Sequence, residues 1–331
     1  MANIRAMRLL GAIELGATDG AELESLLADP SRQAEWSALL EMRGQTRRMA
    51  ASNTAINAIV ASPTAINAVA SSGMARSEIS LNDTAFNAVT ASSTAFGKFI
   101  AGCADLVPAH YADIAAVIAS SDAMSAVAES PEAMAAIAAS TTAMNAVAAS
   151  SAAMGILAAS RAAMTAIAAS STAMTAIAAS STAMTAIELT SPYSASVPTM
   201  TSNTSPVGVV SANRQDGGEA WCAFDKSTVT WWQSNGAPEN WINYRFPYRV
   251  SVYKVTINND GTYGMNAFKI QASNNGVEWT DVATSSMALG EIKTLTPSLF
   301  TRAYYWRLLG TTQHNQTAAM IKELNFYGIK V

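Results

Sequence analysis

Residues that could act as nucleophiles, proton carriers or soft metal ligands are scarce in this chain of 331 residues, which has two histidines and two cysteines. His110 and His314 lie far apart, and Cys103 and Cys222 fall in different halves, so neither a disulfide framework nor a zinc site is indicated. The sequence shows no nucleophile elbow, phosphate loop or recognisable pair of catalytic carboxylates. We therefore expect a protein that is not an enzyme.

One short segment does gather such residues, because Cys103, Asp105, His110 and Asp113 occur within eleven positions. The segment interrupts a regular repeat. A metal site is one interpretation, and a local kink in which His110 caps a helix is the other. The sequence favours the kink.

The composition is half apolar but only 13% charged, and most of the apolar residues are alanine. Ser, Thr or Asn interrupts the alanine-rich runs about every ten residues, so no stretch of roughly 18 apolar residues exists to cross a membrane. A net charge of -4 gives no basic footprint for nucleic acid. The first residues lack a convincing cleavage site, so we expect a chain made in the cytoplasm without a signal peptide, wherever it later acts.

Residues 1–50 contain the conventionally charged helical sequence of the first half. One helix is expected after Thr18-Asp19-Gly20, and a second is expected to begin at Ser31 as its N-cap. This segment is interpreted as a cap on the repeats that follow, or as a face that docks on a partner.

Residues 51–187 repeat every ten positions. Each clear unit begins with Ser, as at Ser130, which Pro131 follows in the way expected at a helix start. An apolar pair three residues apart occupies each later unit, with Met at 124, 134, 144, 154, 164, 174 and 184 and Ile, Val or Leu three positions on. We predict two-turn helices that stack into a solenoid, with both columns inside.

Two other structures would also repeat every ten residues, a single continuous helix and a β-solenoid. In one continuous helix the Met and Ile stripe would rotate by about 80° per ten residues and face no single partner. A β-solenoid is disfavoured because alanine is depleted in strands and is the best helix former. Residues 188–206 are rich in Ser, Thr and Pro and are predicted to be a linker.

From residue 207 to residue 331 the sequence changes to short alternating strands between Gly, Asn and Asp turns, which predicts an antiparallel β-sandwich. Four segments there resemble the discoidin, or coagulation factor type C, domains and galactose-binding-like carbohydrate-binding modules. Residues 223–232 resemble the motif A-x-D-G-x-x-x-T-x-W, and 241–246 resemble W-I-x-h-D-h. Residues 268–279 resemble h-x-I-x-x-S-x-D-G-x-x-W, and 321–328 resemble h-x-E-h-x-h-Y-G. The fold class expected is a multidomain α and β chain, a short-helix stalk followed by a jelly roll.

The resemblance implies a module that binds glycans, or in some members lipid or protein, through loops at one end. It also implies a structural Ca²⁺, whose ligands would fall on Asp225, Ser227, Thr230 and Glu323 and be completed by backbone carbonyls. The alternative is that Asp225 and Glu323 only tie loops together. Lys226 stands where the family has glycine, which places a positive charge beside that site.

Sugar binding requires aromatic rings and side chains that make planar hydrogen bonds, gathered on loops at one rim. Three loops supply candidates, each of which could equally be a solvated turn. The tryptophans of this region are expected in the core. The glycan candidates are Arg214, Asp216, Tyr263, Asn266, His314 and Asn315.

The N-terminal segment and the Ala/Ser/Met decapeptides resemble tracts of structural proteins of tailed bacteriophages. That resemblance implies a virion protein, a tail fibre or a fibre associated with the tail or capsid. Other virion proteins would bind its N-terminal segment, and a host cell-surface polysaccharide would bind its sandwich. Fibres are commonly trimeric, so a homo-oligomer is expected and a trimer favoured. The alternatives are a virion protein-docking module without a glycan ligand, and a bacterial surface adhesin.

Overall fold

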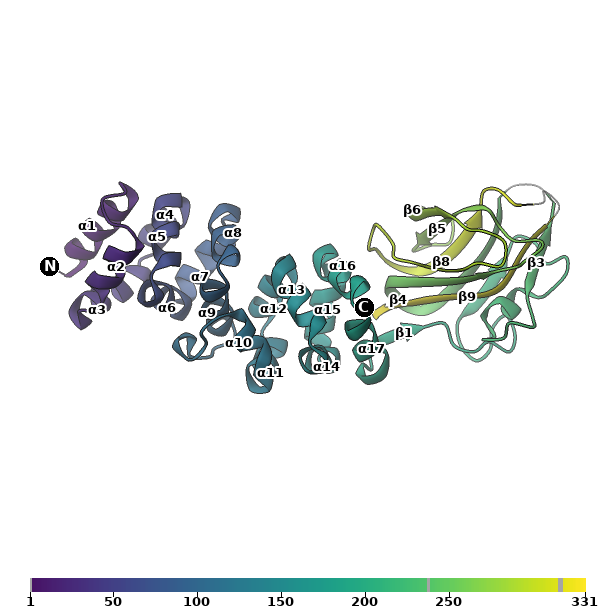
Figure 1. Ribbon diagram of the computed structural model, residues 1–331, viewed down its shortest axis with the longest axis horizontal. Helices are drawn as coiled ribbons and strands as arrows, with labels where there is room; N and C mark the ends of the chain where they lie inside the picture. The colour runs from purple at the N-terminus through teal and green to yellow at the C-terminus, as the bar shows by residue number, and fades with distance from the viewer. Residues whose placement is uncertain (1, 237–238, 315–317) are drawn as a thin grey trace. The chain divides into compact units, whose positions relative to one another are not determined.

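The computed structural model describes residues 2–236, 239–314 and 318–331 (Figure 1). Two compact units make up the chain, Met1–Ala166 and Ile167–Val331. Within the described residues, seventeen short α-helices precede an antiparallel β-sandwich, which confirms the expected fold class. None of those helices is by itself long and apolar enough to cross a membrane.

Four helices form the described part of the N-terminal segment. The side chain of Asp19 caps α2 and makes a reciprocal capping box with Glu22. The prediction that Ser31 caps the next helix is wrong. Asp29 caps α3 and accepts the backbone N–H and the hydroxyl of Ser31, because Pro30 takes the first helical position, where its missing N–H costs nothing. The helices are α1 (Ala2–Glu14), α2 (Gly20–Leu27), α3 (Pro30–Leu40) and α4 (Arg43–Ala51).

The decapeptides form separate helices, as predicted. Ser130 is representative, because its Oγ accepts the N–H of Ala133 at 3.2 Å and so satisfies one amide at the helix start. The helices of the repeats are α5 (Asn53–Ala61), α6 (Pro63–Ser71), α7 (Gly73–Ser80), α8 (Asp83–Ala91), α9 (Ser93–Cys103), α10 (Ile114–Ala119), α11 (Ser121–Glu129), α12 (Pro131–Ala139), α13 (Thr141–Ala149), α14 (Ser151–Ala159), α15 (Arg161–Ala169), α16 (Ser171–Ala179) and α17 (Ser181–Thr190).

Stacking joins helices that lie three apart in the chain, as α4 packs on α7, α6 on α9 and α11 on α14. The bend of 100° between α13 and α14 shows how a chain of straight helices turns back on itself in this way. The columns of Met and of Ile, Val or Leu are buried from Met124 to Met174, as predicted. Cap serines also connect neighbouring turns, because Ser160 Oγ donates to Ala128 O at 2.9 Å.

The irregular segment after α9 contains a 3₁₀ turn, η1 (Pro108–His110), and then α10. Asp113 caps α10, since its Oδ1 accepts the N–H of Ala116 at 2.8 Å, so the cap is Asp113 and not His110. Cys103 is buried, and burial raises the pKa of its thiol. Among the residues that the structure describes, no three His, Cys, Asp or Glu side chains are placed to hold a metal ion.

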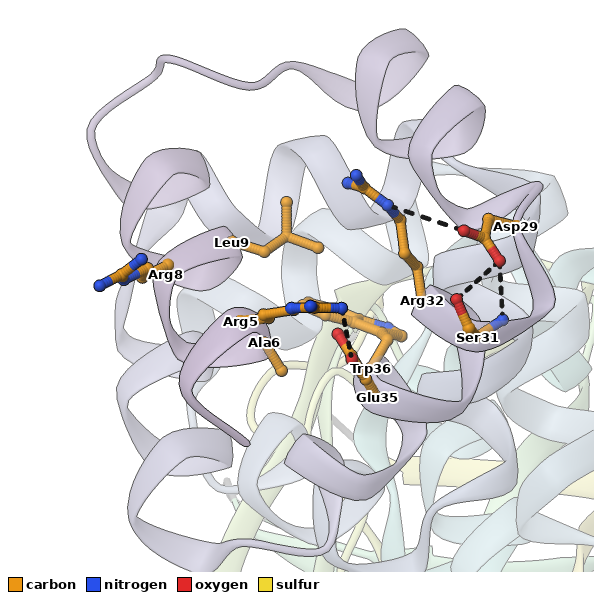
Figure 2. A pocket seen from close by; sticks show the side chains of 9 residues that line it. All are labelled: Arg5, Ala6, Arg8, Leu9, Asp29, Ser31, Arg32, Glu35 and Trp36. Atoms are coloured by element: carbon orange, nitrogen blue, oxygen red, sulfur yellow. Dashed lines mark hydrogen bonds and ion pairs between the residues drawn. The ribbon is translucent and has the colours of Figure 1, made fainter. Parts of the chain in front are cut away.

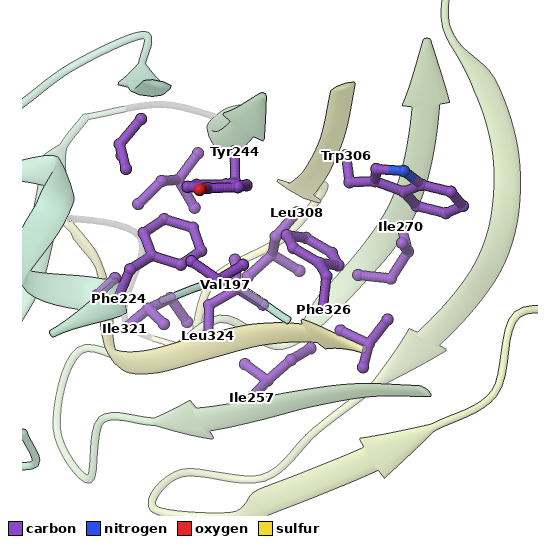
Figure 3. Close-up of a cluster of buried hydrophobic side chains, with 14 of the residues drawn as sticks. Val197, Phe224, Tyr244, Ile257, Ile270, Trp306, Leu308, Ile321, Leu324 and Phe326 are labelled. Atoms are coloured by element: carbon purple, nitrogen blue, oxygen red, sulfur yellow. The ribbon is translucent and has the colours of Figure 1, made fainter. Parts of the chain in front are cut away.

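The sandwich of the second unit is antiparallel throughout. Its main path runs β1-β9-β4-β8-β5-β6, with β2 and β7 paired to β4 and β3 paired to β9. The core between its layers includes Phe224, Tyr244, Trp306 and Phe326 (Figure 3). The strands and the one 3₁₀ turn are β1 (Ser194–Ser196), β2 (Val209–Ala212), η2 (Ala220–Phe224), β3 (Trp232–Asn235), β4 (Asn240–Asn259), β5 (Ala267–Ser273), β6 (Thr280–Ser286), β7 (Ile292–Leu295), β8 (Arg302–Gly310) and β9 (Ala318–Lys330).

Strand β4 belongs to both layers. Its register with β8 shifts between Arg245 and Val250; Val250 and Ser251 pair with both β8 and β9, and the residues after them pair with β9 and β7. Pro247 lies within the shift, where a missing backbone N–H does least harm to the pairing. The single strand thus turns from one sheet layer into the other.

The second unit extends further toward the N-terminus than the sequence predicts. Within the expected linker, β1 pairs with β9, Val197 and Met200 are buried in the core, and the N–H of Val197 donates to Asn325 Oδ1 at 3.1 Å. Residues 194–200 are therefore part of the sandwich. The sequence predicts a linker there because Val197 and Met200 are surrounded by polar residues and proline. The last helices of the repeats also lie in this unit, where α16 packs against β4.

Candidate functional site

One end of the sandwich brings together both ends of β4. Asn240, where β4 begins, pairs with Gly310 of β8. Asn259, where β4 ends, donates through its side-chain amide to Met265 O at 2.9 Å, and Met265 forms a bridge with Gln313, three residues after Gly310. We call this end the rim, and define it by residues 213–218, 231–236, 260–266 and 310–314.

Arg214 and Asp216 are held on the rim by β3. Arg214 Nη1 donates to Asn235 O at 2.8 Å, and Asp216 Oδ2 accepts the N–H of Asn235 at 2.7 Å. The indole of Trp232, which is fully buried, donates to Arg214 O at 2.8 Å. Both charged side chains are exposed, yet their backbone is fixed to the core.

Asn266 and His314 are held by a common neighbour, Met287. The N–H of Met287 donates to Asn266 O at 2.9 Å, and His314 Nε2 lies 2.9 Å from Met287 O. A carbonyl oxygen only accepts, so Nε2 carries the proton in this contact. The N–H of His314 also donates to Gly264 O at 3.2 Å.

Tyr263 lies on the same loop as Gly264, and its side chain is 39% exposed. Asp260 fixes this loop, since its Oδ1 accepts the N–H groups of Thr262 and Tyr263 at 2.7 and 2.8 Å. Burial by itself would raise the pKa of Asp260, but these two N–H groups and Lys322 outweigh it, so the pKa lies below its usual range.

The two groups of loops adjoin one another. Gln313 donates from its side-chain amide to Gly236 O at 3.5 Å, next to the residues that hold Arg214. The N–H of Met320, which pairs with Gln233 of β3, donates to Tyr263 O at 2.8 Å. The structure therefore brings five of the six glycan candidates onto neighbouring loops, and Asn315 lies outside the described residues.

Trp231 is a rim residue that the sequence reasoning missed. Five tryptophans of the region are buried or half-buried, as expected, but the Trp231 side chain is 39% exposed. Its indole donates to Gly217 O at 2.7 Å, one residue after Asp216. The alternation of β3 could have signalled this, because Trp232 faces inward and its predecessor must face the other way.

The residues implied as calcium ligands gather beside the turn that follows η2. Asp225 is already engaged, since Oδ1 accepts the N–H of Ser227 at 2.9 Å and Oδ2 accepts the hydroxyl of Thr230 at 2.7 Å. Lys226 Nζ lies 3.6 Å from Glu323 Oε1. Burial raises the pKa of Glu323 to about 7 although Lys226 lowers it, and burial lowers the pKa of Lys226. The ion pair between Lys226 and Glu323 thus offsets only part of the free-energy cost of burying the two charges.

This donor set does not fit a calcium ion as it stands. Ca²⁺ takes six or more oxygens, and an ammonium ion already stands beside the carboxylate that would be its main ligand. In the described part of the chain no group of three His, Cys, Asp or Glu residues could hold a metal ion.

A second polar site lies in the N-terminal segment, as a cavity of about 320 Å³ lined by Arg5, Arg8, Arg32 and Trp36 among others (Figure 2). Arg5 faces Glu35 at 3.8 Å and Arg32 faces Asp29 at 4.0 Å. These distances are long for ion pairs. The lining has three arginines against two acids, Asp29 and Glu35, so positive charge is in excess.

Residues 222–308 match the family model described as a NedA-like, galactose-binding domain. Chitosan-binding module 1 of a chitosanase/glucanase from Paenibacillus sp. IK-5 is 29% identical over 37% of this chain and 95% of the module, with a TM-score of 0.34. The family 32 carbohydrate-binding module of NanJ from C. perfringens, solved with galactose, is 23% identical over 40% of this chain and 98% of the module, with a TM-score of 0.34. No curated protein matches the chain.

The C-terminal sandwich thus contains, at residues 222–308, a galactose-binding-like domain of the coagulation factor type C class. This confirms the resemblance, and the match includes the first three of its four motifs.

Proposed function

We propose that the sandwich binds a glycan at the rim. One observation carries this proposal: the four segments of the rim place exposed Arg, Asp, Asn and His side chains and two partly exposed rings at one end of a domain that matches a galactose-binding family. Planar polar groups can each hydrogen-bond adjacent sugar hydroxyls, and aromatic faces pack against the apolar face of a pyranose ring.

The rim residues divide into two roles. Tyr263 and Trp231 offer ring surface on which a sugar could stack. Arg214 and Asp216 offer side chains that hydrogen bonds to Asn235 orient, and Asn266 offers its amide from a backbone held by Met287. A fixed site loses little conformational entropy on binding, which favours a measurable affinity from few contacts.

The test is titration calorimetry of the full chain with galactose and with host polysaccharide, preceded by a glycan array. We expect Tyr263→Ala and Trp231→Ala each to weaken binding by about tenfold, because an aromatic contact contributes about 1 kcal/mol beyond its buried area. Tyr263→Phe keeps the ring and should bind like the parent. Arg249→Ala, an exposed arginine at the turn within β4, is the matched control for Arg214→Ala.

Two results would contradict the site. If every glycan fails to bind, the alternative of a protein-docking module without a glycan is favoured. If a glycan binds but Tyr263→Ala, Trp231→Ala and Arg214→Ala all leave its affinity unchanged, the sugar binds elsewhere on the sandwich.

For the whole chain we propose a structural attachment protein of a tailed-phage virion. The support is the resemblance of its decapeptides to phage structural tracts and the order of its parts, a helical array followed by a glycan-binding type of domain. Weak sites in many copies would give avid attachment, since linked sites raise overall affinity without new contacts. The positively lined N-terminal cavity suits docking to an acidic surface of another virion protein.

Antibody labelling of phage particles in electron microscopy tests this role. Labelling at the tail or capsid surface is the expected result. Labelling of bacterial cells that carry no phage would instead favour the surface adhesin.

A further inference from the structure

Glu323 presents an unusual electrostatic situation in the sandwich. It lies on β9 opposite Asn258, and its side chain is only 17% exposed. Both carboxylate oxygens are buried, and in the described part of the chain no donor meets normal hydrogen-bond geometry with either of them. The groups that favour their charged form are the backbone N–H and the ammonium of Lys226. A buried carboxylate with so few donors is costly unless a cation stands close to it.

The cation beside it is Lys226. Its Nζ lies 3.6 Å from Glu323 Oε1, and the lysine side chain is itself only 33% exposed. The same ammonium also feels the carboxylate of Asp225, the residue before it in the chain. The Lys226 ammonium is therefore attracted to two carboxylates, Asp225 on the loop and Glu323 on the strand, which are nearly a hundred residues apart in the sequence.

The backbone of Lys226 is in a conformation that is unfavourable for lysine. Its φ is +61°, in the left-handed region where a side chain costs energy and glycine does not. Lysine at such a position has a local cost that glycine would avoid. An interaction of the side chain can offset that cost, and the ion pair with Glu323 is such an interaction.

We propose that the Lys226 ammonium serves as the structural cation of this domain, in the place where a metal ion would otherwise join the 225–230 loop to β9. The loop holds its own shape through Asp225, which binds Ser227 and Thr230. Lys226 then joins that loop to the strand. A divalent ion beside Glu323 would meet the repulsion of this ammonium and too few oxygen ligands. The module accordingly needs no metal for its stability.

The first test compares unfolding of the full chain in EDTA and in millimolar CaCl₂. Six of the seven tryptophans lie in the sandwich, so intrinsic fluorescence follows that domain. We expect the same unfolding midpoint in both buffers. A midpoint that rises with calcium would overturn the proposal, because a metal ion would then bind the folded domain.

The second test is a double-mutant cycle with Lys226→Met and Glu323→Gln, which keep side-chain length while removing charge. Lys226→Met alone should lower the ratio of folded to unfolded protein by about tenfold, because it leaves a buried carboxylate without its cation. Adding Glu323→Gln should recover most of that loss. Additive effects of the two changes would show that the residues do not act as a pair.

Lys322→Met is the matched control. Lys322 is the neighbour of Glu323 on β9, is 34% exposed, and faces Asp260 at 3.5 Å. We expect it to show no coupling to Glu323→Gln. Coupling as strong as that of Lys226 would mean that general charge balance, and not the specific pair, explains the first cycle, and the proposal would fail.

Discussion

In the helical array most of the described helices are started by a serine, α8 by Asn82 and α10 by Asp113, and each buries apolar residues within the next ten positions. In the sandwich, β4 pairs with β9, some seventy residues later in the chain. Each repeat of the array carries its own helix cap and its own buried residues, and contacts between helices three apart join the repeats. The sandwich forms only when distant segments meet. The difference predicts that a destabilising substitution lowers the stability of only the neighbouring helices in the array, but lowers the stability of all strands in the sandwich.

Core truncation should separate the two regions most clearly. Phe326 is fully buried, with its ring centroid 6.3 Å from that of Trp306, and Met144 is fully buried in the array. We expect Phe326→Ala to cost about 3–5 kcal/mol and Met144→Ala about 2–5 kcal/mol. Hydrogen exchange should show Phe326→Ala weakening every sandwich strand, and Met144→Ala weakening only the helices near α13. Loss of protection along the whole array in Met144→Ala would contradict the local view.

This comparison explains what could be predicted from the sequence. Ser130, Met134 and Ile137 specify their helix without reference to the rest of the chain, so period and capping were sufficient. The capping residue Asp29 was missed because Ser31 is an equally good cap by residue type, and the position of Pro30 decides between them.

The family motifs predict the sandwich, but they do not predict all the residues of its core, its rim and its ion pairs. Val197 lies in a Pro-rich stretch and joins the core only through a strand more than a hundred residues away. The exposure of Trp231 depends on which face of β3 meets the core. The geometry between Lys226 and Glu323 depends on a loop and a strand that no local pattern connects.

Removal of single caps should have smaller effects, in a definite order. Ser150 caps α14 by accepting the N–H of Ala153, so Ser150→Ala should cost about 1 kcal/mol. Ser160 caps α15 and also donates to Ala128 O, so Ser160→Ala should cost about 2 kcal/mol. The exposed Ser151 is the control, and Ser151→Ala should stay within about 0.5 kcal/mol of the parent. Urea unfolding followed by far-UV circular dichroism measures all three. Equal losses at Ser150 and Ser160 would mean that the bond between turns contributes nothing.

The pH dependence of stability tests whether the charge of Asp260 stabilises the rim loop. Its pKa lies below the usual range in the folded chain, so its stabilisation is present above the unfolded-state pKa and is lost as the pH falls through the folded one. Asp260→Asn should cost about 1 kcal/mol at neutral pH, because the loop amides keep a weaker acceptor. The loss should vanish in acid, where the parent is also neutral. A loss that persists unchanged at low pH would show that the charge of Asp260 does not matter.

The smallest effect is expected where the last helices of the repeats meet the sandwich. Tyr253 lies on β4, against which α16 packs, and its side chain is fully buried. Burial raises the pKa of its phenol, Glu188 adds to that rise, and its hydroxyl has no hydrogen-bond partner among the described residues. A buried hydroxyl without a partner contributes no stability, so Tyr253→Phe should be neutral or stabilise by about 0.5 kcal/mol. Thermal unfolding of the full chain measures the change, and Tyr244→Phe is the control, because the Tyr244 hydroxyl donates to Val207 O at 2.6 Å and its removal should destabilise. If Tyr253→Phe destabilises as much as Tyr244→Phe, a water molecule satisfies the Tyr253 hydroxyl, and the packing between helix and strand is polar.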